Sequence, residues 1–86
     1  MINLLIGLRR YRHMVERIVI NPKMQHGKPV IKGTRVTVAR ILGGLAGGMA
    51  KEEIAREYEI TEEDILAALR YAADLVEEEQ FHPLPA

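Results

Sequence analysis

The chain has 86 residues, enough for one small domain whose limited core should leave it only marginally stable. It contains no cysteine and no serine, which excludes disulfides, thiolate zinc sites and the commonest catalytic nucleophiles. The formal net charge is zero, but residues 1–40 carry nine Lys and Arg against one acid, whereas residues 51–71 carry three against seven. Any polyanion should therefore bind to the first half.

Nothing in the sequence favours a membrane segment or an enzyme. No apolar stretch reaches the roughly 18–20 residues of a membrane span. The apolar run at the start of the chain is followed by arginines, whereas a secretory signal has its positive charges before the apolar run. None of His13, His26 and His82 has a partner at metal-ligand spacing. We therefore expect a cytoplasmic, non-enzymatic protein that has no metal, no cofactor and no membrane attachment.

The first predicted elements are short strands. Residues 1–16 form an N-terminal extension, either a short amphipathic helix or a frayed arm. The β-branched run at 17–20, which ends at the turn pair Asn21-Pro22, predicts a strand. The β-prone runs 30–31 and 35–38 predict a small ribbon with it, across a basic loop at 24–34.

Three helices are expected next, within a single domain over residues 17–80. The first is predicted from apolar residues at helical spacing over 38–49. Gly47-Gly48 is its expected C-terminal stop. Gly43-Gly44 inside it would be explained by another backbone packing closely. The second helix covers residues 51–58, with Ala50 as a poor N-cap. Residues 81–86 are expected to be an extended tail.

The last helix begins at Thr61, with Asp64 at the reciprocal capping position, and Thr34 and Thr37 are also expected in turn or cap roles. Its apolar stripe is wider than a core of this size needs, which favours a dimer. We expect the core or dimer contacts of this helix to come from Ile65, Leu66, Leu69, Ala72, Ala73 and Val76.

Residues 47–71 have the outline of a helix-turn-helix DNA reader, but their charge opposes that use. In such readers the first residues of the second helix reach base edges. Here these include Glu62, Glu63 and Asp64, which phosphates would repel. We therefore place nucleic-acid contacts in the basic first half, at Lys23, Lys28, Lys32, Arg35 and Arg40.

Four segments give the chain a family resemblance: Asn21-Pro22, GKPVIKGTRVTV at 27–38, the Gly48-Met49 pair before KEEI at 51–54, and EITEEDILAALRYA at 59–72. They resemble domain-of-unknown-function family 433, a large bacterial and archaeal family. Thr37 and Ala50 depart from the family's usual proline and serine. The resemblance implies a mainly α fold, a homeodomain-like three-helix bundle with a short N-terminal β element. It also implies likeness to antitoxins, which bind a nuclease-like toxin and repress their own operon.

Two functional hypotheses follow. In the first, the protein is a dimeric, non-enzymatic antitoxin-like regulator that binds DNA and a toxin partner. In the second, it is a protein-interaction module without nucleic-acid binding, whose oppositely charged halves pair head to tail between subunits.

Overall fold

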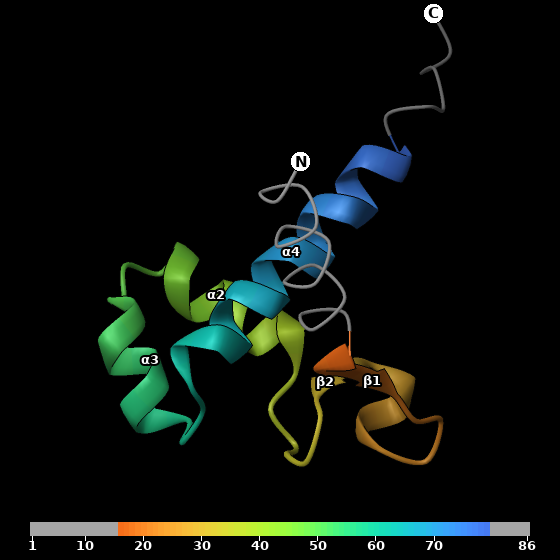
Figure 1. Ribbon diagram of the computed structural model, residues 1–86, viewed down its shortest axis with the longest axis horizontal. Helices are drawn as coiled ribbons and strands as arrows, with labels where there is room; N and C mark the ends of the chain where they lie inside the picture. The colour runs from red at the N-terminus through yellow and green to blue at the C-terminus, as the bar shows by residue number, and fades with distance from the viewer. Residues whose placement is uncertain (1–15, 80–86) are drawn as a thin grey trace, which may run out of the picture.

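A short antiparallel ribbon leads into three α-helices in the structure, a computed structural model that describes residues 16–79 (Figure 1). The elements are β1 (Ile18–Ile20), the 3-10 turn η1 (Gln25–Gly27), β2 (Pro29–Ile31), α2 (Val38–Ala46), α3 (Lys51–Glu57) and α4 (Glu62–Glu79). The predicted mainly helical class and N-terminal β element are confirmed; the homeodomain-like assignment stays a prediction. Residues 1–15 and the tail lie outside the described residues. No described helix is long and apolar enough to cross a membrane.

The ribbon pairs Ile18 with Ile31, Val19 with Val30 and Ile20 with Pro29. The amide of Lys32 donates to the carbonyl of Arg17 at 2.7 Å, so hydrogen bonding to β2 falls on residues 17 and 19 of the first strand. On its other side, Val30 forms a single bridge with Thr37. The predicted strand at 35–38 is reduced to that bridge because Thr37 already caps α2.

The predicted roles of the threonines are confirmed. The Thr34 hydroxyl donates to the carbonyl of Ile31 and accepts from the amide of Val36, which closes the turn after β2. The Thr37 hydroxyl accepts from the amide of Arg40 at 3.0 Å and caps α2. The chain therefore leaves the ribbon and enters the helices through two side-chain-supported turns.

The glycines of α2 separate into two kinds. Gly48, at φ 96°, ends the helix, and the amides of Gly48 and Met49 return to the carbonyls of Leu45 and Gly44, as in a Schellman motif. The predicted stop is thus confirmed. The predicted backbone contact at Gly43-Gly44 is wrong: a Cβ on Gly44 would meet side chains of α3 and the preceding loop, and one on Gly43 would meet open space.

α3 is short and its ends depend on its neighbours. Ala50 is the N-cap and offers no side-chain acceptor, although the Glu53 carboxylate accepts from its amide at 3.3 Å. At the other end Glu59 takes a left-handed φ of 55°, and the amide of Ile60 returns to the carbonyl of Ala55. Ile60 is thereby brought into the core.

α4 carries the predicted capping arrangement. The amide of Thr61 donates to the carboxylate of Asp64 at 2.9 Å, and the amide of Asp64 donates to the Thr61 hydroxyl at 3.1 Å. Its first half packs on the other elements, while its second half runs beyond them (Figure 1). The core joins β2, the turn after it and all three helices through Ile31, Val36, Val38, Ile41, Ile54, Ile60, Ile65 and Ala68.

Candidate nucleic-acid interface

Four of the five predicted DNA-contacting residues belong to the ribbon and its turns, and we call Lys23, Lys28, Lys32 and Arg35 the basic ribbon. All four are exposed. Lys23 follows an Asn21 turn, in which its amide donates to the Asn21 carboxamide oxygen at 2.9 Å. Lys28 follows η1, and Lys32 and Arg35 flank the turn after β2. The fold therefore keeps these cations together on one small element.

The other cations of the described residues are mostly engaged. Arg17 binds Glu63 at 2.6 Å and Asp64 at 2.9 Å. Two other cations also bind carboxylates: Lys51 binds Glu62 at 2.7 Å, and Arg70 binds Asp74 at 3.1 Å. Within residues 16–79, no carboxylate lies within ion-pair distance of the basic ribbon. Its charge is thus left to solvent or to a ligand.

The acids at the start of α4 are occupied by these pairs. Asp64 is buried, and its carboxylate serves both the Thr61 amide and the Arg17 guanidinium. The Glu62 carboxylate, by its hydrogen bond and its charge, raises the pKa of Lys51 above the ordinary value. The N-terminus of α4 is therefore a closed ion-pair cluster. That this helix does not read the major groove stays a prediction.

Arg40, the fifth predicted contact, lies apart from the basic ribbon. It is on the first turn of α2, and its guanidinium carbon lies 4.4 Å from the centroid of the Tyr58 ring. This cation–π contact joins α2 to the end of α3. The structure thus gives Arg40 a packing role that the basic-ribbon residues lack.

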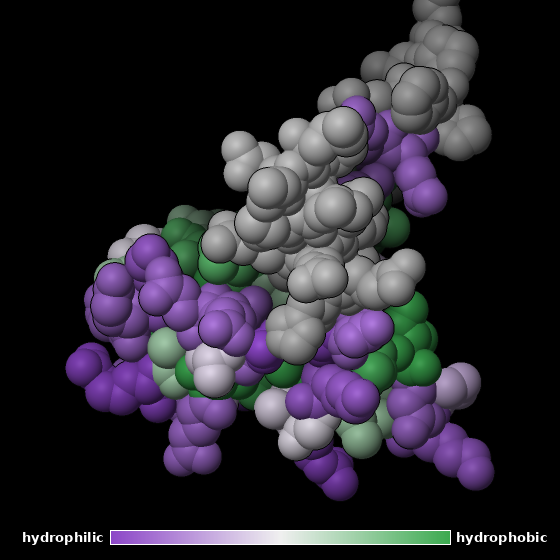
Figure 2. All heavy atoms as spheres, in the orientation of Figure 1, coloured by the Kyte–Doolittle hydropathy of each residue, from purple (hydrophilic) through white to green (hydrophobic). Residues whose placement is uncertain are grey.

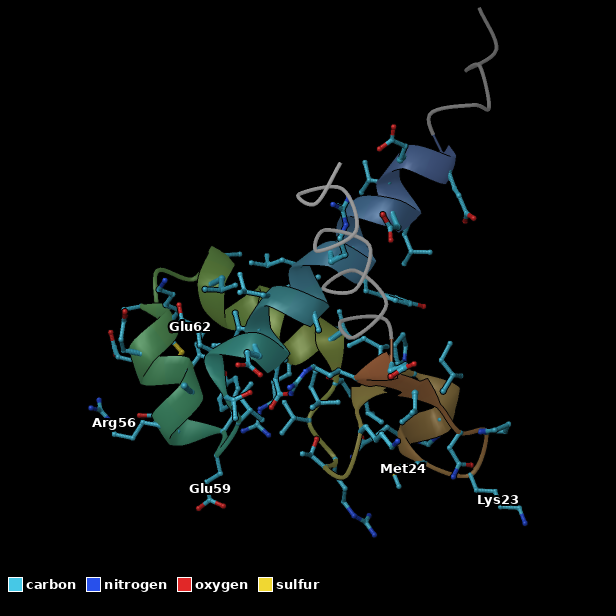
Figure 3. All side chains as sticks on the ribbon, in the orientation of Figure 1. Lys23, Met24, Arg56, Glu59 and Glu62 are labelled. Atoms are coloured by element: carbon cyan, nitrogen blue, oxygen red, sulfur yellow. The ribbon has the colours of Figure 1, made fainter. Side chains whose placement is uncertain are left out.

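The two faces of the ribbon differ in character. Ile18 and Ile20 line a groove against α4, whereas Val19, on the opposite face, borders a shallow depression of about 480 Å³. Thr34 and Arg35 also line that depression. In Figure 3 Lys23 projects from the ribbon end and Arg56 from α3, on opposite sides of the molecule. Arg35 therefore borders a depression that α4 does not line, whereas Lys32 lines another depression with Arg17 and Asp64, at the start of α4.

This surface has the chemistry of an anion-binding face. Lysine and arginine side chains on a shallow surface can neutralise phosphates without any catalytic group. Among residues 16–79, no three His, Asp or Glu side chains come together in a way that could hold a metal ion.

The predicted contact stripe of α4 splits into two faces. Ile65 is in the core and Ala72 is half-buried, whereas Leu66, Leu69 and Val76 are 44%, 42% and 55% exposed. The exposed Leu66, Leu69, Ala73 and Val76, which we call the outer row, follow a 3-4-3 spacing. Such a row faces away from the core and suits another protein surface.

Two residues that organise this arrangement were missed in the sequence. Arg17 was counted only among the bases of residues 1–40 and placed in the predicted strand at 17–20, yet it ties the ribbon to α4 across 47 positions. Tyr58 was predicted only as the last residue of the second helix, yet its ring makes the cation–π contact with Arg40. The one local sign was the surplus of acids at the start of α4, which needed a cation from elsewhere.

Comparison with known proteins gives a sequence match and a structure match, both from Mycobacterium tuberculosis. The chain is 31% identical over 67 residues to a protein named "Putative antitoxin VapB45" (strain ATCC 25618 / H37Rv), covering 78% of this chain and 28% of that protein. The crystal structure of Rv2018 matches with a TM-score of 0.59 and 32% identity, covering 70% of this chain and 27% of that one. The chain thus spans little more than a quarter of the length of the protein matched in each comparison.

The family comparison covers most of the described domain. Residues 18–72, from β1 through most of α4, match the profile of a family described as "Protein of unknown function (DUF433)". Because this match covers more than half of the chain and agrees with the segments identified in the sequence, the chain belongs to the DUF433 family.

Proposed function

We propose that this protein is a non-enzymatic, antitoxin-like regulator that binds DNA through the basic ribbon and binds a toxin protein through its helical half. The observation that carries the proposal is the division of the cations. Arg17, Lys51 and Arg70 have carboxylate partners, whereas Lys23, Lys28, Lys32 and Arg35 have none among residues 16–79. Neutralising phosphates with free cations releases counterions, so unpaired side chains contribute most.

The toxin partner is proposed from the relative's name and from the outer row. An apolar row on an exposed helix needs a covering surface, and the flanking side chains of α4 are largely acidic. A toxin with a basic rim around an apolar patch would match it. We propose a homodimer as the form that binds DNA, and cytoplasmic location is part of the same proposal.

DNA binding is tested by fluorescence anisotropy with the protein's own upstream DNA and a scrambled duplex, at low and moderate salt. The variant carries Lys28→Ala, Lys32→Ala and Arg35→Ala together. Each lost phosphate contact should reduce the slope of log affinity against log salt by about 0.9, so this variant should lose up to about 2.7 per copy. Affinity at moderate salt should fall by at least an order of magnitude.

A matched control uses the other side of the molecule. Arg56 is exposed on α3, far from Lys23 in Figure 3, and has no acidic partner among the described residues. Arg56→Ala and Arg35→Ala both remove one exposed guanidinium, but only the second should change the salt slope. Equal effects would mean that binding follows net charge, and the assignment to the basic ribbon would be wrong.

The second candidate, an interaction module without nucleic-acid binding, is favoured by the outer row. In its head-to-tail form the unpaired cations of the basic ribbon would bind acids of another subunit. Glu62, Glu63 and Asp64 are not free for this, because they already pair with Lys51 and Arg17 inside one chain. If neither duplex is bound at low salt while the protein co-purifies with another protein, this candidate replaces the first.

A further inference from the structure

The outer edge of β1 is an unfinished sheet. Because residues 17 and 19 bond to β2, the amides and carbonyls of Ile18 and Ile20 point away from it. Within residues 16–79 the sheet has two strands, so nothing described there pairs with this edge. An open edge of uncharged, β-branched residues is a template for another strand.

A groove runs beside that edge. It has a volume of about 340 Å³ and lies between Ile18 and Ile20 on β1 and Tyr71 and Leu75 on α4. Ile20 is 58% exposed and Leu75 is 45% exposed. Figure 2 shows a hydrophobic area at the ribbon end of the molecule. Arg70, Asp74 and Glu78 also line the α4 side of this groove. The sheet edge and the groove form one surface, which can hold a strand that has apolar side chains on one face.

We propose that β1 of a second copy of this chain occupies this surface, antiparallel to β1 and centred on Val19. In that register Ile18 of each copy lies opposite Ile20 of the other copy. These two symmetric pairs use all the outward amides and carbonyls of both strands. Shifting the centre to Ile18 or Ile20 pairs only one outward residue of each strand. The result is a four-stranded sheet in the order β2-β1-β1-β2.

The second copy fits because the strand complements itself. Residues 18–20 carry no charge, so two copies place no like charges opposite one another. All isoleucines of the paired strands fall on the face of α4, where Ile18 and Ile20 of the second copy contact Leu75. Two-fold pairing also closes the edge, which leaves no site for a third copy.

This dimer would enlarge the DNA-binding surface of the basic ribbon, a consequence that rests on the DNA binding proposed above. The faces that carry Val19 and border Arg35 become continuous across the two-fold axis. The dimer can then make up to eight phosphate contacts rather than four. The slope of log affinity against log salt should therefore steepen from about −3.6 to about −7. It leaves the outer row of α4 free for the toxin.

Cross-linking tests the register directly, because the chain has no cysteine. Val19 lies on the axis in a non-hydrogen-bonded pair, where the two Cα atoms are about 4.5 Å apart, within reach of a disulfide. Val19→Cys should therefore form a covalent dimer under mild oxidation. Ala39→Cys, exposed on α2, should not, and Leu69→Cys reports pairing through the outer row.

A proline variant distinguishes loss of the dimer from loss of the fold. Ile20→Pro removes an outward amide that β2 does not use, so the chain should keep its circular dichroism but become monomeric by light scattering at about 100 µM. Ile20→Val keeps the amide and should stay dimeric. The proline variant should also lose about half of the salt slope.

A wild-type monomer at that concentration, a proline variant that stays dimeric, or a Leu69→Cys cross-link without one at Val19 would each overturn the inference. A monomer that still binds DNA through the basic ribbon would overturn the dimer alone. A dimer cross-linked at Val19 that binds no DNA would uphold the dimer and remove the proposed function.

Discussion

The junction between the ribbon and α4 depends on Asp64, so Asp64→Ala should lower the free energy of unfolding substantially. The carboxylate is 11% exposed, accepts from the amide of Thr61 at 2.9 Å and binds Arg17 at 2.9 Å. Losing the cap costs about 0.5–1 kcal/mol, and losing a charged hydrogen bond about 1.5–3 kcal/mol. Because Arg17 keeps Glu63 and is one-quarter exposed, we expect a total of about 2–3 kcal/mol.

That loss is large for a domain of this size. At about 0.05–0.15 kcal/mol per residue, 86 residues give roughly 4–13 kcal/mol in total. The melting temperature should fall by about 8–24 °C. Because the chain has no tryptophan, urea and thermal unfolding are followed by far-ultraviolet circular dichroism of the helices.

Glu63→Ala is the matched control, since Glu63 binds the same arginine from a side chain that is 70% exposed. It should cost less than about 1 kcal/mol. If Asp64→Ala costs no more than Glu63→Ala, the junction does not depend on the buried carboxylate. A double-mutant cycle of Arg17→Ala with Asp64→Ala should also be non-additive by more than about 0.5 kcal/mol.

Three further predictions concern the helix ends and surfaces. Glu59→Gly should raise the free energy of unfolding by about 0.5–1 kcal/mol, because glycine adopts the φ of 55° without strain; no gain in urea would contradict this. Gly43→Ala, facing open space, should stabilise by up to about 1 kcal/mol, whereas Gly44→Ala should gain less, because its Cβ lies 3.1 Å from the Tyr58 hydroxyl; equal melting temperatures would refute the contact. Lys51→Met should remove the stability that comes from the Lys51–Glu62 ion pair. That stability is present below the unfolded-state pKa of lysine and is lost as pH rises through the raised folded pKa. The free energies of unfolding of the two proteins should therefore converge in strongly alkaline solution, and a difference that persists there would exclude the ion pair as its cause.

Local signals predicted the helix ends well because the groups that make them are close in sequence. Thr61 and Asp64 are three positions apart, and the stop at Gly48 needs only the last turn of α2. The strand at 17–20 was also predicted, since β-branched residues before Asn-Pro have few alternatives. In these places the backbone hydrogen bonds are completed within a few residues.

What could not be predicted depends on residues that are distant in sequence. The run 35–38 has β propensity, but the Thr37 hydroxyl starts a helix there and tertiary contacts with β2 leave only one bridge. The neighbours of Gly44 come from residues 49–58, beyond the end of its own helix. For the candidate site, exposure of the basic ribbon followed from composition, but the engagement of Arg17 by Glu63 and Asp64 required the fold.

The closed cluster at the start of α4 also decides between two ways of holding DNA. Using α4 as a recognition helix would bring Glu62 and Glu63 against phosphates and would require the pairs with Lys51 and Arg17 to break. The Arg17 pair also fixes the ribbon on the helices, so breaking it would loosen the element that carries the free cations. Binding through the basic ribbon needs neither change. We therefore expect Glu62→Gln and Glu63→Gln to leave base preference in the anisotropy assay unchanged, and a changed preference would point to α4 as the reading element.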